Sequence, residues 1–135
     1  MPGCGSNPAP PPLSLISLRT AATAICAATS TKTGRISPPA SAAGAAAFLA
    51  RGATLLKGES DQLRRLRAPA EWESEYRTAL ADLDSTVSEL ARAASDLRTG
   101  DPVIEIRLVR QRLPALQTKQ DQSWKALGIP ACEAR

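Results

Sequence analysis

The most regular pattern of apolar residues in this chain lies between Pro69 and Gly100. Apolar positions follow one another there at steps of three or four residues, which is the spacing of one face of an α-helix. They are Trp72, Tyr76, Leu80, Leu83, Val87, Leu90, Ala94 and Leu97. The pattern predicts a helix of about eight turns. Because an amphipathic helix is not stable alone in water, other helices are expected to cover this face.

Two segments before this helix repeat the same spacing. The first covers residues 13–31. The second is predicted to begin with Ser37 as N-cap and Pro38 as the first helical residue, and to reach about Arg67. It contains three glycines, each of which either weakens the helix by about 1 kcal/mol relative to alanine or marks close contact with a neighbouring helix. They are Gly44, Gly52 and Gly58.

A last helix is predicted over residues 102–127, with Asp101 as N-cap. Pro114 lies inside it and removes one backbone hydrogen bond, so we expect a kink there. The apolar spacing keeps its phase across this proline, which predicts one kinked helix rather than two. Gly128 is expected to end the helix, with Ile129 folded back onto it.

Four helices with short connections predict an all-α fold, an antiparallel up-down-up-down four-helix bundle. The bundle is expected to occupy residues 13–135, and no segment has the alternating pattern of a strand. Residues 1–12 are rich in proline and are expected to form a flexible tether.

The composition supports a helical core that lacks large side chains. Hydrophobic residues make up 43% of the 135-residue chain but aromatic residues only 3%, so alanine and leucine must fill most of the core. The net charge of +4 is unevenly placed, because residues 70–100 carry seven acids and three bases while the other segments are basic. This pattern suits complementary helix flanks, and it argues against nucleic-acid binding, which requires a continuous basic face.

Two of the three cysteines are predicted to form a disulfide. Cys26 lies in the first helix and Cys132 lies five residues beyond Leu127. In the predicted topology the last helix ends beside the start of the first one, so an extended tail can reach Cys26. The alternative is two unrelated buried thiols. A bridge would indicate an oxidising compartment.

Cys4 is left over, and its surroundings are similar to the cleavage point of a bacterial lipoprotein, where a lipidated cysteine starts the mature chain. No apolar leader precedes it in this sequence, so either the true start lies upstream of Met1 or the similarity is due to chance. No apolar run reaches the 18 residues of a transmembrane helix. We therefore expect contact with a membrane only through a lipid on Cys4.

Residues 14–135 resemble a broad class of small exported helical proteins from bacteria with GC-rich genomes. The resemblance lies in Ala24-Ile25-Cys26, in the run Ala-Ala-Ala-Phe-Leu at 45–49, in Leu66-Arg67-Ala68-Pro69 and in the end segment 127–132. Thirteen arginines against four lysines agree with such a genome. The resemblance implies an exported bundle with paired cysteines near its ends, and it implies no activity.

Residue types that carry common enzyme chemistry are scarce. The chain has no histidine, which removes the most frequent general base and metal ligand. Four acids of the third helix, Glu71, Glu75, Asp82 and Glu89, are expected to be solvated rather than paired for catalysis. Glu59 is the only acid in line with a core stripe, and we expect it to reach solvent or pair with an arginine. We predict no catalytic residue, cofactor or metal site.

The aromatic residues are predicted to gather at one end of the bundle. Trp72 and Tyr76 open the third helix, and Trp124 lies near the end of the fourth. Antiparallel topology brings these ends together, near the tail that carries Cys132. Phe48 is expected at the opposite end, with Leu97.

These features predict a non-enzymatic helical bundle that is exported or membrane-tethered and acts as an interaction module of the cell envelope. Its partner is expected to be a protein, and the bundle itself a monomer or weak oligomer. This extracytoplasmic location assumes a leader missing from the N-terminus. The alternative is a cytoplasmic protein that completes its bundle with another chain.

Overall fold

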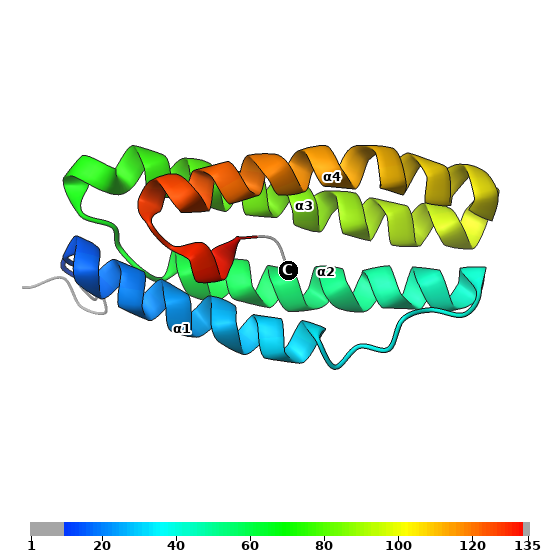
Figure 1. The fold of residues 1–135 in the computed structure, drawn as a ribbon, viewed down its shortest axis with the longest axis horizontal. Helices are drawn as coiled ribbons and strands as arrows, with labels where there is room; N and C mark the ends of the chain where they lie inside the picture. The colour runs from blue at the N-terminus through cyan, green and yellow to red at the C-terminus, as the bar shows by residue number, and fades with distance from the viewer. Residues whose placement is uncertain (1–9, 134–135) are drawn as a thin grey trace, which may run out of the picture.

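A computed structural model describes residues 10–133 of the chain. Its regular structure is entirely helical and contains four long helices: α1 (Leu15–Thr33), α2 (Ala42–Arg64), α3 (Glu73–Thr99) and α4 (Pro102–Leu127). Successive helices run in opposite directions along one long axis (Figure 1). The prediction of an all-α four-helix bundle is confirmed.

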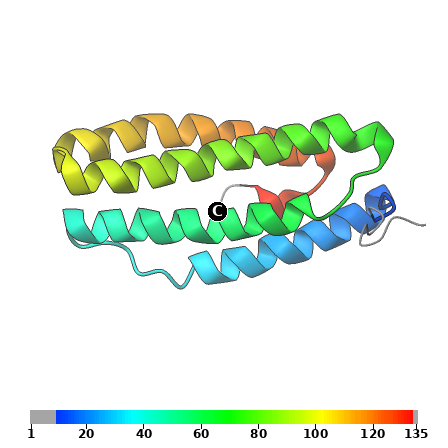
Figure 2. The same ribbon diagram turned by 180° about the vertical axis from the view of Figure 1, so that it is seen from behind.

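The four helices do not surround the core evenly. The most extensive packing joins α2 to α3 and α3 to α4, and α1 packs less extensively on α2. The side of the bundle between α1 and α4 is bridged by the short 3₁₀ helix η2 (Pro130–Cys132), which contacts both. Seen from either side, η2 lies between these two helices near one end of the bundle (Figures 1 and 2). The chain therefore closes its core partly with its own tail.

The apolar face predicted for α3 forms the centre of the core. Six of its eight predicted positions are buried, and Trp72 and Val87 are partly buried against the same core. Burial of each large aliphatic side chain stabilises the fold by about 1.5–3 kcal/mol relative to exposure. The buried six are Tyr76, Leu80, Leu83, Leu90, Ala94 and Leu97.

The start of α2 differs from the prediction. The helix begins at Ala42 after Ser41, whose hydroxyl accepts a hydrogen bond from the Gly44 amide at 3.0 Å. Ser37 and Pro38 lie in the connection instead. The reason is the second proline, Pro39, because a residue that precedes proline is driven out of the helical region.

The region between α2 and α3 is also less regular than predicted. The second helix ends at Arg64 rather than Arg67, because Arg67 binds the N-terminal segment: its carbonyl accepts from the Leu13 amide at 2.9 Å, and its guanidinium donates to the Pro10 carbonyl at 3.0 Å. Pro69 has an extended ψ of 149° and precedes a 3₁₀ turn, η1 (Ala70–Trp72), before α3 begins. Pro69, the first residue of the segment with the regular apolar pattern, therefore lies outside the third helix.

The boundaries of the fourth helix agree with the sequence pattern. Asp101 caps it by accepting a hydrogen bond from the Val103 amide at 2.9 Å, and the helix continues through Pro114 to Leu127. The prediction that Pro114 does not end the helix is confirmed. Gly128 then adopts a left-handed φ of 72°, and the Ile129 amide donates to the Trp124 carbonyl at 3.0 Å. The chain turns back as predicted, and Ile129 is fully buried.

Three of the four aromatic residues share one cluster, as predicted. The rings of Tyr76 and Trp124 meet edge to face with centroids 6.2 Å apart, and Trp72 packs partly buried against the same core. Cys132 belongs to this core cluster as well. Phe48 is not a member of the cluster and lines a groove further along the bundle.

Gly128 provides the first testable prediction. A Cβ atom there would lie 2.9 Å from the guanidinium of Arg19, whose Nε donates to the Leu127 carbonyl at 2.8 Å. Gly128→Ala should therefore strain the left-handed turn and displace this bond, and lower the free energy of unfolding by about 1–3 kcal/mol. Urea unfolding followed by circular dichroism measures the change.

The matched control is Gly58→Ala. Gly58 is helical, and a Cβ there meets nothing within 4 Å, so the same substitution should stabilise the protein by up to about 1 kcal/mol. A Gly128→Ala variant as stable as the Gly58→Ala variant would contradict the proposed strain.

Candidate functional site

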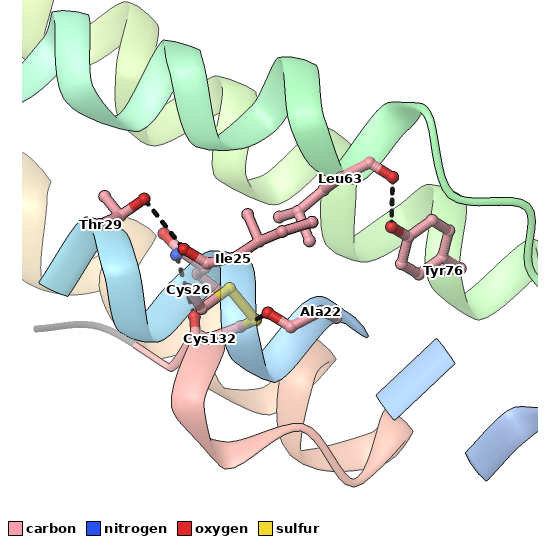
Figure 3. The surroundings of a disulfide bond; sticks show 8 residues. Ala22, Ile25, Cys26, Thr29, Leu63, Tyr76 and Cys132 are labelled. Carbon is pink, nitrogen blue, oxygen red and sulfur yellow. Dashed lines mark hydrogen bonds between the residues drawn. A yellow bond between two sulfur atoms is a disulfide. The ribbon is translucent and has the colours of Figure 1, made fainter. Parts of the chain in front are cut away.

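The cysteine pair joins the C-terminal tail to the first helix. Cys26 of α1 and Cys132 of η2 form a disulfide with Cα atoms 5.1 Å apart and 106 positions apart in sequence. Both side chains are buried, and the Sγ of Cys132 lies 3.6 Å from the Ala22 carbonyl oxygen. Figure 3 shows the bond between α1 and the tail, on the side that faces Leu63 and Tyr76. The predicted pairing is confirmed.

Glu59 lies beside this disulfide, and its carboxylate is a group that could in principle bind a metal ion. One of its carboxylate oxygens and the two sulfur atoms all lie within 4.8 Å of one another. Because the sulfur atoms are joined to each other, neither offers the thiolate that a metal ion would need. Glu59 is only 1% exposed, so it does not reach solvent, and pairing with an arginine, the other half of the expectation, stays a prediction. The disulfide between α1 and the tail lies against this carboxylate and helps to bury it.

Two polar side chains near the disulfide form a hydrogen bond with each other. The Thr86 hydroxyl of α3 donates to the Gln120 side-chain carbonyl of α4 at 2.9 Å, and the Gln120 amide lies 3.5 Å from the Cys132 carbonyl. Thr86 and Gln120 are nearly fully buried. This chain of contacts connects α3, α4 and the tail at the level where the groove begins.

The groove is a cavity of about 360 Å³ that opens beyond the tail, among the second half of α1, α2, α3 and the middle of α4. Its apolar wall comes from the connection after α1, from α2 and from the facing helices. These apolar residues are Ile36, Phe48, Leu49, Leu56, Leu90 and Leu113. Its polar wall consists of the uncharged residues Ser30, Thr33, Thr86, Gln117 and Gln120. No charged side chain lines it among the residues that the structure describes.

Two features of the sequence leave this space open. The first helix has 19 residues, while α2, α3 and α4 have 23 to 27, so α1 ends before its neighbours do (Figure 1). Gly52 of α2 lines the groove, and a Cβ there meets nothing within 4 Å. Gly52 and Gly58 therefore do not mark close helix contacts, which was one of the two interpretations of these glycines.

The four acids that were predicted to be solvated behave in two ways. Asp82 is 6% exposed and accepts a hydrogen bond from Ser123, and the Lys119 ammonium lies 3.8 Å from it. Glu89 pairs with Arg92 at 2.6 Å. The expectation of solvated side chains is wrong for these two, because α4 and Arg92 provide partners, whereas Glu71 and Glu75 are exposed. Asp82 connects α3 to Ser123 of α4, whereas Glu89 pairs within α3, and the chain has no histidine that could activate the Ser123 hydroxyl.

Arg92 and Tyr76 have clearly shifted pKa values. Hydrogen bonding to Glu89 raises the pKa of Arg92, against the opposing effect of its desolvation. Burial raises the pKa of Tyr76, and the charge of Arg64 opposes the rise. The Tyr76 hydroxyl donates to the Leu63 carbonyl at 2.5 Å. Both shifts favour the protonation state that each group already has at neutral pH, so neither indicates an acid–base catalyst.

The sequence reasoning missed the groove. The sequence feature that could have indicated the groove is Gly52. It has no side chain, and it lies among the apolar residues Phe48, Leu49 and Leu56 of the second helix. Cys4, the predicted lipidation site, lies outside the described residues, and lipidation stays a prediction.

No known protein family, characterised protein or solved structure matches this chain at a significant level. In the described part of the chain, no helix combines the length and apolar character needed to cross a membrane. The disulfide and the groove are therefore the features of this structure that bear on function.

Proposed function

We propose that this protein is a non-enzymatic, exported helical module that acts as an interaction component of the cell envelope. The single observation that supports this most is the Cys26–Cys132 disulfide, which is buried in the core and closes almost the whole domain. Disulfides persist in oxidising compartments and are rare where thiols are kept reduced. The groove supplies an uncharged surface on which such a module can bind a partner.

Anchoring through a lipid on Cys4 is part of this proposal. It would hold the bundle at the outer face of a cell membrane while the segment from Cys4 to residue 12 spans the distance to the first helix. Export and lipid attachment are separate parts of the proposal, because a secreted protein must be exported but does not need a lipid.

The alternative function is a cytoplasmic protein that completes its bundle with another chain. The groove favours it, since part of the core is uncovered between α1 and α4. The disulfide argues against it, because reducing conditions would break a bond on which the tail depends.

Cell fractionation with trapping of thiols tests the proposal. Cells of the source organism are quenched in acid, their envelope and cytoplasmic fractions are alkylated, and the masses of peptides containing Cys26 and Cys132 are measured. We expect the protein in the exported fractions with both cysteines protected from alkylation. A cytoplasmic protein with both thiols alkylated would favour the alternative function.

Partitioning into detergent tests the lipid anchor separately. Wild-type protein from the native envelope should enter a detergent phase, and a Cys4→Ala variant should remain in the aqueous phase. Equal partitioning of the two proteins would contradict lipidation at Cys4 and leave the export proposal intact.

A further inference from the structure

We propose that the groove binds a single-chain amphiphile with an anionic head group, of the class of medium-chain fatty acids. The hydrocarbon chain would lie against Phe48, Leu49 and Leu113, with the head group at the basic edge of the groove. The inference rests on the proposed binding role of the module, and it does not depend on where in the cell the protein is found.

The size of the groove suits a small molecule. Its volume of about 360 Å³ lies at the lower end of the range of about 300–1,000 Å³ typical of small-molecule sites. A narrow, largely aliphatic space suits one hydrocarbon chain.

The chemistry of the wall excludes a charged group from the interior. Thr86 and Gln120 are its most buried polar residues, and they bond to each other. A carboxylate placed there would lose its hydration without gaining a cationic partner, which is strongly unfavourable. The ligand is therefore expected to insert with its apolar end and to keep its head group at the opening.

The segments that provide most of the groove wall carry an excess of positive charge. Residues 15–51 and 106–120, which provide most of the wall, contain no acid. Lys32 and Arg35 flank the lining residues Thr33, Gly34 and Ile36, and both are exposed.

Arg110 lies on the side of α4 that lines the groove. It precedes Leu113 by three positions and Gln117 by seven, a spacing that places all three on one helix face. Among residues 10–133, Lys32, Arg35 and Arg110 have no acidic partner, since the ion pairs formed there involve other bases. An anionic head group would meet uncompensated cations, and a cationic one would be repelled.

Calorimetric titration of the full chain, with its disulfide intact, tests this inference. Laurate is the probe, kept below its micelle concentration, and dodecyltrimethylammonium is the matched probe with the same chain length and the opposite charge. We expect saturable binding of one laurate per protein and at least tenfold weaker binding of the cationic probe. Equal affinity for the two probes, or no binding of laurate, would overturn the proposal.

Two glycine variants locate the binding site. Gly52→Leu places a side chain in the groove, and Gly58→Leu places the same side chain on the same helix outside the lining, at another position where a Cβ meets nothing within 4 Å. We expect Gly52→Leu to weaken laurate binding at least tenfold and Gly58→Leu to leave it unchanged. Circular dichroism confirms that both variants are folded. Equal binding by the two variants would place laurate elsewhere and overturn the inference.

A triple variant tests the basic edge. Replacing Lys32, Arg35 and Arg110 by Gln should weaken laurate binding about tenfold, because each exposed charge contributes a modest attraction. It should bring the affinities for laurate and for the cationic probe closer together. A synthetic acidic amphipathic helix that binds the groove while laurate fails to displace it would assign the site to a protein partner and overturn the proposal.

Failure of this inference and failure of the proposed function give different results. Loss of laurate binding with the protein still found oxidised in the envelope would contradict only the ligand. Laurate binding by a protein found reduced in the cytoplasm would contradict only the export.

Discussion

Removal of the disulfide, in a Cys26→Ala, Cys132→Ala double variant, should lower the free energy of unfolding by roughly 3–5 kcal/mol. The bond links residues 106 positions apart, and a cross-link over about 100 residues restricts the unfolded chain strongly, by up to about 4.7 kcal/mol in the chain-entropy model. For a domain of this size the loss corresponds to a fall in melting temperature of roughly 10–20 °C. Differential scanning calorimetry measures it.

The effect should extend to the tail. Because η2 is the element that bridges α1 and α4, loss of the disulfide leaves this element held by noncovalent contacts, such as the burial of Ile129 and the contact of Gln120 with the carbonyl of residue 132. Hydrogen exchange at the amide of residue 132 should therefore accelerate more in the double variant than exchange in the middle of α3.

The matched control is Cys4→Ala, the same substitution outside the bundle. It should leave the melting temperature unchanged, and wild-type protein in excess reductant should melt close to the double variant. A double variant that melts within about 2 °C of wild type would show that the bond contributes little, as when residual structure in the unfolded chain offsets the entropic term.

The sequence pattern predicted the helices well because their signals are local. The apolar residues of α3 recur every three or four positions, so the sequence alone identifies this helix. The end of α4 was predicted from Gly128, because the left-handed turn there strongly favours glycine. The start of α2 was misplaced because two adjacent signals competed. Ser37-Pro38 is a good helix start on its own, but Pro39 prevents it.

The groove and the burial of Glu59 could not be predicted in this way. Apolar spacing identifies which face of a helix points inward, but it does not show whether neighbouring helices fill the space they enclose. Whether the space is filled depends on the length of α1 relative to α2 and α4, and on the absence of a side chain at Gly52. The sequence does not show which residues of the other helices face Gly52. Glu59 is buried because the disulfide-linked tail lies over it. This tertiary effect leaves no local signal.

The two tryptophans provide the second large prediction. Trp124 is fully buried and contacts the ring of Tyr76, whereas Trp72 is only partly buried at the start of α3. Trp124→Ala should cost about 3–5 kcal/mol, the sum of lost burial and an unfilled cavity. Trp72→Ala should cost about 1–2 kcal/mol, since water already reaches part of its ring. Urea unfolding of the two variants compares identical substitutions that differ in burial.

A third variant separates the volume of Trp124 from its polar atom. The indole Nε1 is buried and has no hydrogen-bond partner within the part of the chain that the structure describes, and an unpaired buried donor costs about 1–3 kcal/mol. Trp124→Phe removes that donor and keeps one aromatic ring against Tyr76, so its cost should be well below that of Trp124→Ala. If Trp124→Phe destabilises the protein as much as Trp124→Ala, the indole N–H is satisfied in solution. If Trp72→Ala is the more damaging of the two alanine variants, the bundle end is closed by Trp72 rather than Trp124.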